Sequence, residues 1–340
     1  MIKGKGAVLT AGMLALVAAG CAKSEKTVVN EANRKYVEAW MDVNYPGVTP
    51  TELGIYIIED KPGTGETFDD QTYVNIDCTV RSLSGTISST TEASVAQQLG
   101  TYEKADYYGA QYTATGEYSI AAGLEDLLKG MKVGGTRTAV IPSWLLTYYR
   151  YDKPSDYLKK STDEDNAIYT VTLEGVTDDI LKVQVDAMEE YADKYLDGVD
   201  SLSYGFYYKQ VQAPTDTNAF PSDTTIYINY TARLLNRQVF DTTIKDTAKF
   251  YNIYSSSNTY EPVQITWDED YTEIAMGDDS SSSSDLITGF QKTLWQMHKY
   301  EKGVGMFFSP YGYKSSGSGS KIPPYAPLVF EIEVVDEPED

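Results

Sequence analysis

Two stretches near the C-terminal end of the chain alternate between apolar and polar residues. In TIYINYTARL (225–234) every second residue from Ile226 to Leu234 is apolar or aromatic, and PLVFEIEVV (327–335) does the same from Leu328 to Val334. A period of two predicts strands that bury one face. Tyr230 and Phe330 fall on the buried faces. The pattern predicts an antiparallel sheet with its core on one side.

A second pattern, with helical spacing, occurs once in each half of the chain. Residues 123–144 (GLEDLLKGMKVGGTRTAVIPSW) and 289–311 (GFQKTLWQMHKYEKGVGMFFSPY) both begin with apolar residues at positions i, i+4 and i+7. A glycine-containing turn, an apolar strand and a proline follow in both. We interpret the segments as copies of one domain, with a short helix whose apolar stripe is Leu124, Leu128 and Met131 in one copy and Phe290, Leu294 and Met297 in the other.

A longer helix is predicted before each copy. NEANRKYVEAWMDVNYPG (30–47) has Tyr36, Ala39 and Trp40 at helical spacing and stops at Pro46-Gly47, and VDAMEEYADKYLDGVDS (185–201) repeats the plan. The predicted fold class is α+β, with two domains that each wrap an antiparallel sheet around a short helix and follow a helix of their own. We assign a tether and helix to 21–48, the first domain to 49–178, a linker helix to 179–200 and the second domain to 201–337.

The N-terminal residues have the charge order of a signal peptide. Lys3 and Lys5 precede an uncharged, mostly apolar stretch that ends at Gly20 and is too short to span a bilayer comfortably. The segment LVAAGC, which ends at Cys21, resembles a bacterial lipobox. This resemblance implies a lipoprotein signal peptide at 1–20, cleavage before Cys21 and lipidation of its thiol. The alternative is an ordinary signal peptide with a chance cysteine.

Lipidation at Cys21 places the expected protein in the bacterial cell envelope, anchored to the membrane rather than spanning it. Ala22 stands where an aspartate would favour the inner membrane, so by analogy with lipoprotein sorting we expect the outer membrane, on its periplasmic or surface face. Cys78 then remains as the free thiol. Stability must come from the hydrophobic cores, because no disulfide within the chain is possible.

Charge and composition exclude several classes of function. The chain has 28 Lys and Arg against 50 Asp and Glu, a net charge of -22, so it repels nucleic-acid phosphates. Its one histidine, His298, argues against histidine-based triads and multi-histidine metal sites. Acidic clusters such as 268–270 lack the spacing of a calcium loop and are interpreted as solvated turns. We predict no cofactor and no nucleic-acid partner.

Four segments of the second copy resemble the FKBP-type peptidyl-prolyl cis-trans isomerases. They are INYTARLLNRQVFDTT (228–243), LITGFQKTLWQM (286–297), FFSPYGY (307–313) and IPPYAPLVFEIEVV (322–335). The resemblance covers residues 202–336 and is interrupted by an insertion at 242–285. It implies that Ser315–Ser320, rich in Ser and Gly, form a mobile loop over the mouth of a pocket that admits a peptide.

The resemblance also implies the residues of that pocket. Its catalytic residues would be Tyr230, Phe240, Asp241 and Tyr313, and its substrate-binding residues Leu286, Ile287, Phe290, Ile322 and Phe330. Phe290 would be the floor, the Ile287 N–H and the Tyr313 hydroxyl would bind peptide carbonyls, and Asp241 would polarise the wall near the rotating carbonyl. The other interpretation is that these aromatic residues are ordinary core.

Such a reaction suits a chain with one histidine. Rotation about an X-Pro bond faces a barrier of about 18–20 kcal/mol, because amide resonance is lost midway. The reaction needs neither a nucleophile nor proton transfer. An aromatic pocket that binds the twisted amide more tightly than the planar one is sufficient for catalysis.

The first copy lacks this constellation. Our sequence alignment puts Cys78 at the place of Tyr230, Ile87-Ser88 at Phe240-Asp241, Leu124 at Phe290, and Leu146 or Tyr148 at Tyr313. We therefore expect the first domain to keep the fold without the activity.

Two functions remain for the whole chain. The favoured one is a peptidyl-prolyl isomerase that helps exported, proline-containing polypeptides to fold, with the activity in the second domain. The alternative is a non-enzymatic docking subunit of a cell-envelope complex that uses isomerase-like folds. The insertion at 242–285 favours the alternative, because a long insertion can cover or reshape the pocket.

Overall fold

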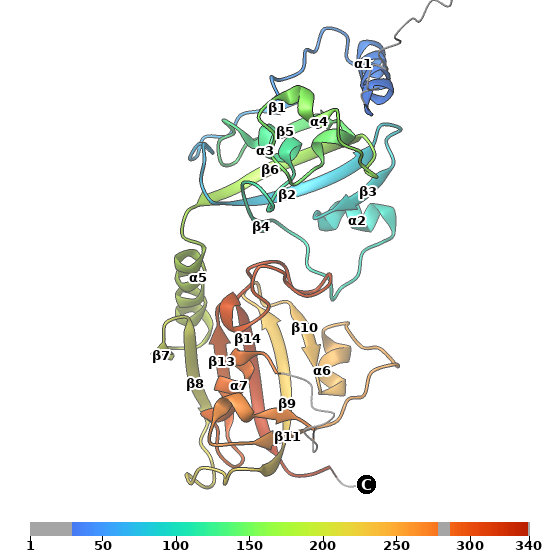
Figure 1. Ribbon diagram of the computed structural model, residues 1–340. Helices are drawn as coiled ribbons and strands as arrows, with labels where there is room; N and C mark the ends of the chain where they lie inside the picture. Colours follow the sequence, from blue (N-terminus) through green and yellow to red (C-terminus); the bar gives the residue numbers. More distant parts are fainter. Residues whose placement is uncertain (1–28, 278–285, 339–340) are drawn as a thin grey trace, which may run out of the picture.

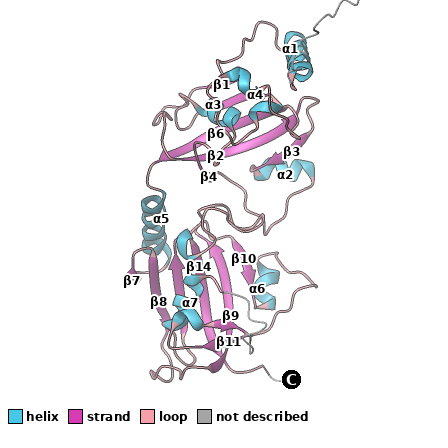
Figure 2. Cartoon of the chain, in the orientation of Figure 1, coloured by secondary structure: helices cyan, strands magenta, loops and turns pink. Residues whose placement is uncertain are grey.

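Two antiparallel sheets form the framework of the molecule. The computed structural model describes residues 29–277 and 286–338, and these fold into a first lobe (29–178) and a second lobe (179–338) (Figure 1). Figure 2 shows that strands dominate both lobes and that helices flank the sheets. The predicted α+β class, with two sheets related by a repeat, is confirmed.

The elements of the first lobe follow the order predicted for a sheet with a short inner helix. They are α1 (Glu31–Asn44), β1 (Tyr56–Lys61), β2 (Tyr73–Ser82), β3 (Ile87–Thr90), α2 (Ala93–Leu99), β4 (Gln111–Ala114), α3 (Ala122–Leu128), β5 (Thr136–Ile141), a 3-10 turn (Ser143–Leu145), α4 (Pro154–Tyr157) and β6 (Ala167–Thr177). The strand order in the sheet is β1-β5-β6-β2-β3, and β4 pairs with β2.

The second lobe repeats this plan and extends it at both edges of the sheet. Its elements are α5 (Ile180–Tyr195), β7 (Asp200–Ser203), β8 (Phe206–Gln212), β9 (Thr224–Leu234), β10 (Val239–Thr242), α6 (Lys245–Phe250), β11 (Val263–Trp267), a 3-10 turn (Tyr271–Glu273), β12 (Ala275–Met276), α7 (Thr288–Trp295), β13 (Lys302–Phe307), a 3-10 turn (Ser309–Tyr311) and β14 (Leu328–Val335). The strand order is β12-β11-β9-β14-β13-β8-β7, and β10 pairs with β9.

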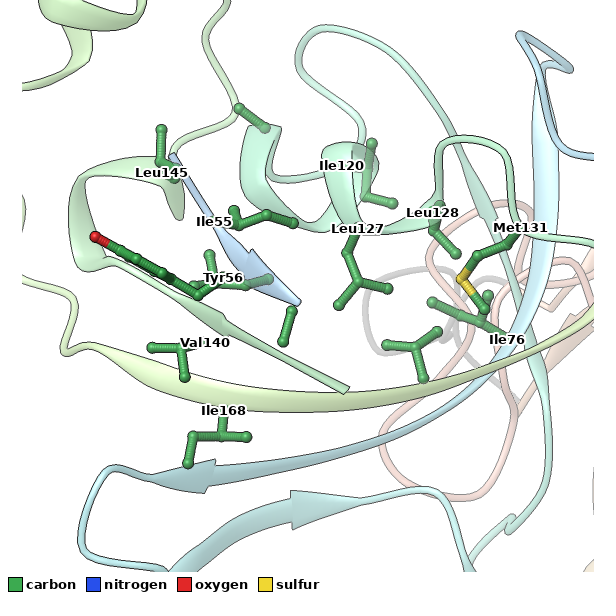
Figure 3. Close-up of a cluster of buried hydrophobic side chains, with 14 of the residues drawn as sticks. Ile55, Tyr56, Ile76, Ile120, Leu127, Leu128, Met131, Val140, Leu145 and Ile168 are labelled. Atoms are coloured by element: carbon green, nitrogen blue, oxygen red, sulfur yellow. The ribbon is translucent and has the colours of Figure 1, made fainter. Parts of the chain in front are cut away.

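The short inner helices carry the apolar stripes that close the cores. The stripe of Phe290, Leu294 and Met297, on α7 and the turn after it, is buried as predicted. In the first lobe the buried set is Leu127, Leu128 and Met131, which point from α3 and the turn after it towards the sheet (Figure 3). The remaining stripe residue, Leu124, is only half-buried. It packs against the edge of the first-lobe core.

The longer helices cover the outer faces of the sheets. Met188, Tyr191 and Ala192 of α5 pack against apolar residues on the far side of β8, β13 and β14, namely Tyr207, Val304, Met306, Phe308 and Val329. The Gln184 side-chain carbonyl also accepts a hydrogen bond of 2.7 Å from the Ser309 N–H. Residues 179–195, treated above as a linker, therefore form a layer of the second lobe.

The helix α1 has the same role on the first lobe, but its buried stripe differs from the predicted one. Val37 and Met41 are buried, whereas Tyr36 is 55% exposed. Ala39 is also exposed and Trp40 is half-buried. Val37 and Met41, which directly follow Tyr36 and Trp40, are therefore the residues through which the helix packs on the lobe.

Most of the described part of the 242–285 segment belongs to the common plan. α6 and β11 occupy the same places in the second sheet as α2 and β4 do in the first, so only the residues from 268 onward are additional. Ile274 is buried in the core of the second lobe, and the Gln291 side chain donates to its carbonyl oxygen at 3.0 Å. This extension lies along α7. Within the described residues, no helix combines the length and the apolar character needed to cross a membrane.

Candidate active site

Phe330 on β14 is the centre of an aromatic cluster in the second lobe. Its ring centroid lies 5.0 Å from that of Phe290 on α7, 5.7 Å from Phe307 and 6.2 Å from Phe240, and only 6% of the residue is exposed. The Phe290 and Phe240 rings are nearly perpendicular to it, an arrangement that aromatic quadrupoles favour. One apolar wall is therefore built from residues of β10, α7, β13 and β14.

Tyr230 joins this wall to the only carboxylate among the predicted site residues. Its ring meets Phe290 edge-on at a centroid distance of 5.7 Å, and its hydroxyl donates a hydrogen bond of 2.8 Å to Asp241. Burial, and then the nearby Asp241 charge, raise the pKa of Tyr230 far above its usual range. The phenol therefore stays protonated and keeps donating to the carboxylate at every physiological pH.

A β-bulge places Asp241 at the rim. The pairing of β10 with β9 slips between Val239 and Asp241, so Phe240 turns into the cluster while Asp241 stays exposed. The Thr242 N–H donates to the second carboxylate oxygen at 2.9 Å. Both oxygens of Asp241 thus have a fixed partner. The side chain is held at the edge of the apolar wall instead of moving freely in solvent.

The predicted substrate-binding residues surround the same cluster. Ile322 is buried, and Leu286 and Ile287 are half-buried against the aromatic core. Among the described residues, no acceptor pairs with the Ile287 N–H, and none pairs with the hydroxyl of the half-buried Tyr313. Burial, and then Asp241, raise the pKa of Tyr313 as well. Two hydrogen-bond donors are therefore available at the rim.

The loop expected over the pocket makes hydrogen bonds within itself and with the first lobe. Within the loop, Ser318 and Ile322 exchange backbone hydrogen bonds of 2.8 and 3.2 Å, and Gly317 and Gly319 take positive φ angles of 63° and 53°. The first lobe then binds its tip: the Ser320 hydroxyl donates to Asp106 at 2.6 Å, and the Ser320 carbonyl accepts from the Tyr107 N–H at 2.8 Å.

The same segment of the first lobe also binds the turn before β10. The Gln238 amide donates to the carbonyl oxygens of Ala105 and Asp106 at 3.0 and 2.7 Å. Tyr107 packs against the core of the second lobe. Figure 1 shows the loop between α2 and β4 meeting the loops of the second lobe. Residues 105–107 are thus part of the surroundings of the second-lobe pocket, a role that the sequence did not indicate.

Hydrogen bonds fix the correspondence between the lobes. The Cys78 N–H donates to Thr91 Oγ1 at 2.9 Å, as the Tyr230 N–H does to Thr243 Oγ1 at 2.9 Å, so Cys78 takes the place of Tyr230 as predicted. Strand pairing, however, makes Ser88-Ser89 the counterpart of Phe240-Asp241, one residue after the predicted Ile87-Ser88. Both strands have the bulge at the same place, and eleven residues separate Cys78 from Ser89 as they separate Tyr230 from Asp241, so an ungapped alignment from Cys78 gives the observed pairing.

The remaining first-lobe counterparts follow from the same register. Tyr169 on β6 takes the place of Phe330, and Leu124 that of Phe290. Counting on from the two 3-10 turns puts Thr147, between the predicted Leu146 and Tyr148, at the place of Tyr313. The first lobe has no carboxylate at the Asp241 position and no phenol at the Tyr230 position.

Two further predictions concern metal binding and lipidation. No group of three or more His, Cys, Asp or Glu side chains within residues 29–277 and 286–338 is arranged to hold a metal ion. Cys21, the predicted lipidation site, lies outside the described residues, as do 278–285 of the extension near α7. Phe307, a member of the aromatic cluster, was not predicted, although the apolar run before Ser309 marked its strand.

The second lobe is thus a sheet wrapped around a helix, with an aromatic cluster and one carboxylate held at its edge. Residues 217–335 match the model of the FKBP-type peptidyl-prolyl cis-trans isomerase family. This range contains all nine predicted pocket residues. Residues 217–335 of the second lobe therefore form an FKBP-type peptidyl-prolyl cis-trans isomerase domain.

Comparisons with individual proteins are more distant. A Haemophilus influenzae protein named as a probable FKBP-type peptidyl-prolyl cis-trans isomerase is 22% identical over 186 residues, which cover 54% of this chain and 65% of that protein. The solved structure of a Pseudomonas syringae peptidyl-prolyl cis-trans isomerase is 23% identical and covers 46% of this chain and 92% of its own, with a TM-score of 0.31. The three FKBP domains of wheat FKBP73 cover 84% of this chain and 98% of their own, at 14% identity and a TM-score of 0.29.

Proposed function

We propose that the protein is a peptidyl-prolyl cis-trans isomerase whose activity resides in the second lobe and whose substrates are proline-containing polypeptides. The observation that carries this proposal is the Tyr230–Asp241 pair at the edge of the Phe330 cluster. A hydrogen-bonded carboxylate at the rim of an apolar pocket is not needed for packing the core. The family match over the same residues supports the proposal.

The geometry accounts for catalysis by differential binding. A prolyl ring against Phe290 and Phe330 leaves water, and its amide lies beside the aromatic wall. The planar amide is strongly dipolar and loses hydration there, whereas the twisted amide has less charge separation and loses less. The Ile287 N–H and the Tyr313 hydroxyl, which pair with no acceptor in the described residues, would bind the carbonyls on either side. Asp241 adds a fixed negative charge near the rotating carbonyl.

The first lobe cannot supply these interactions. Cys78 and Ser89 stand where the second lobe has Tyr230 and Asp241. We propose that it has no catalytic activity of its own and that it holds the pocket loop through Asp106 and Tyr107.

Replacing Asp241 by alanine should lower kcat/KM for an X-Pro peptide about tenfold, because a charged hydrogen-bonding partner is worth roughly 1.5–3 kcal/mol. Tyr313→Ala should lower it by a smaller factor. Both side chains are at the rim, so thermal unfolding should change little. A protease-coupled assay resolves these effects, since uncatalysed exchange takes tens to hundreds of seconds.

Ser89→Ala, at the matching exposed position of the first lobe, is the control and should leave the rate unchanged. If the unmodified protein does not accelerate isomerisation, the docking-subunit alternative replaces the enzyme. If both Asp241→Ala and Tyr313→Ala retain full activity, the pocket described here is not the catalytic one.

We further propose that the protein is an exported lipoprotein of the bacterial cell envelope and acts on exported polypeptides. Support comes from the sequence of residues 1–21 alone. Cys21→Ser should leave an uncleaved precursor without lipid, because the modification requires the thiol. Metabolic labelling with a fatty-acid probe measures this, and equal labelling of mutant and unmodified protein would disprove lipidation at Cys21.

A further inference from the structure

A cleft of about 520 Å³ lies in the first lobe at the place that corresponds to the second-lobe pocket. Its floor contains Cys78 and Leu124, the counterparts of Tyr230 and Phe290, and Tyr169, the counterpart of Phe330, lies in its wall. In the second lobe, the larger rings of Tyr230 and Phe290 stand at the equivalent positions. The replacement of two large rings by Cys and Leu therefore opens a space whose volume is typical of ligand sites.

The chemistry of the cleft suits uncharged, apolar groups. None of its lining residues in the described part of the chain is charged, although charged residues make up 23% of the sequence. Tyr112, Tyr118, Tyr148 and Tyr169 present their rings, and the Cys78 thiol is neutral because burial raises its pKa to about 12. Tyrosine combines an apolar face with a polar tip, which suits side chains of an unfolded polypeptide.

One wall of the cleft comes from the second lobe. Ser315, Pro324 and Tyr325 line it, and the Tyr325 ring lies edge-on to Tyr73 of the first lobe at a centroid distance of 5.4 Å. Tyr313 and Ile322, in the same loop, belong to the second-lobe pocket. One loop thus separates the cleft from the pocket, and its tip is fixed to the first lobe through Ser320.

From this shared wall we infer that the cleft is a second, non-catalytic binding site for the polypeptide whose prolyl bond occupies the second-lobe pocket. The inference rests on the proposed isomerase function. A chain that leaves the pocket passes over the loop and reaches the cleft, where an uncharged segment with Phe, Leu or Tyr side chains is bound. Two sites on one chain raise the affinity for long unfolded substrates without changing the chemical step.

Removing the exposed rings of the cleft tests this inference without disturbing the core. Tyr118 and Tyr148 are 70% and 54% exposed. Tyr118 has a φ of 66°, so asparagine, which tolerates this conformation, is the better replacement there. The test variant is Tyr118→Asn with Tyr148→Ala. The control is Tyr36→Ala with Tyr204→Ala, two tyrosines that are 55% and 59% exposed and lie outside the cleft.

Three synthetic peptides serve as probes for the chain without its first 21 residues, which contains both lobes. One is the tetrapeptide Ala-Leu-Pro-Phe, the second extends it to about 20 residues with an uncharged segment rich in Phe, Leu and Tyr, and the third extends it with Ser, Thr and Gly. Fluorescence anisotropy of labelled peptides gives Kd, and the isomerisation assay gives kcat/KM.

We expect the test variant to bind the apolar 20-residue peptide at least fivefold more weakly than the unmodified and control proteins. Its kcat/KM for the tetrapeptide and its Kd for the polar peptide should be unchanged. An unchanged Kd for the apolar peptide would overturn the inference. Absence of isomerisation of every peptide would instead refute the proposed enzyme function, and the Kd comparison would still decide whether the cleft binds polypeptide.

Discussion

A fragment that contains residues 199–340 should be largely unfolded, whereas one that contains 179–340 should unfold cooperatively. The difference is α5, in which Ile180 is buried and Met188 and Tyr191 pack against the outer face of the sheet. At about 1.5–3 kcal/mol for each large apolar side chain, these three contribute about 5–9 kcal/mol, comparable to the whole stability of a small domain. Far-ultraviolet circular dichroism with urea unfolding measures the difference.

Two variants of the 179–340 fragment test whether the buried face of α5 causes this difference. The longer fragment with Met188→Asp should lose most of its stability, because the charge would enter a fully buried position. Glu190→Asp, a conservative change on the exposed side of the same helix, should have no effect. Equal stability of the 199–340 and 179–340 fragments would show that α5 is only a linker.

Replacing Glu301 by alanine should lower the free energy of unfolding by about 3–5 kcal/mol. Glu301 is 1% exposed, and its carboxylate accepts hydrogen bonds from the Tyr208 hydroxyl at 2.6 Å, the Gln210 amide at 2.9 Å and the His298 N–H at 3.0 Å. Burial, and then this carboxylate, raise the pKa of Tyr208 far above its usual range. Alanine would leave buried donors without an acceptor.

Urea unfolding of the full chain, followed by tyrosine and tryptophan fluorescence, measures this effect. Glu301→Gln keeps one acceptor oxygen and should cost less than the alanine variant. Glu190→Ala, on the exposed face of α5, should stay within about 0.5 kcal/mol of the unmodified protein. A loss below about 1 kcal/mol for Glu301→Ala would mean that the Glu301 network does not stabilise the second lobe.

The sequence was sufficient to predict the sheets and the core-facing residues of the second lobe. Strict alternation put Tyr230 and Phe330 on the inner face, and both contact the aromatic cluster there. The repeat was visible because the inner helices share their spacing and are followed by the same turn and strand. These signals are local, and each depends on a few consecutive residues.

The outer helices were harder to place. An alternating strand predicts a solvated outer face, yet Val329, on the other face from Leu328 and Phe330, is 2% exposed beneath α5. The continuous apolar run Leu328-Val329-Phe330 indicates burial on both faces at this end of β14. The charged residues Glu331 and Glu333 that follow hid this signal.

Contacts between the lobes could not be predicted from local patterns. The Ser/Gly composition of 315–320 gives no sign that Ser320 at its tip is hydrogen-bonded to Asp106, which is 214 residues away in the sequence. The pairing of Ser88-Ser89 with Phe240-Asp241, in contrast, was predictable. Eleven residues separate Cys78 from Ser89, as they separate Tyr230 from Asp241, and both lobes have the bulge at the same place, so an ungapped alignment gives the observed register.

The most direct test of the central claim is a rate measurement on the two lobes separately. Fragments 179–340 and 29–178, each with its own outer helix, are added at equal concentration to a protease-coupled X-Pro peptide assay. We expect the first to accelerate isomerisation and the second to leave it at the uncatalysed rate, because only the first has Tyr230, Asp241 and Tyr313 around one aromatic pocket. Acceleration by the 29–178 fragment alone, or by neither fragment when both are folded, would contradict the account.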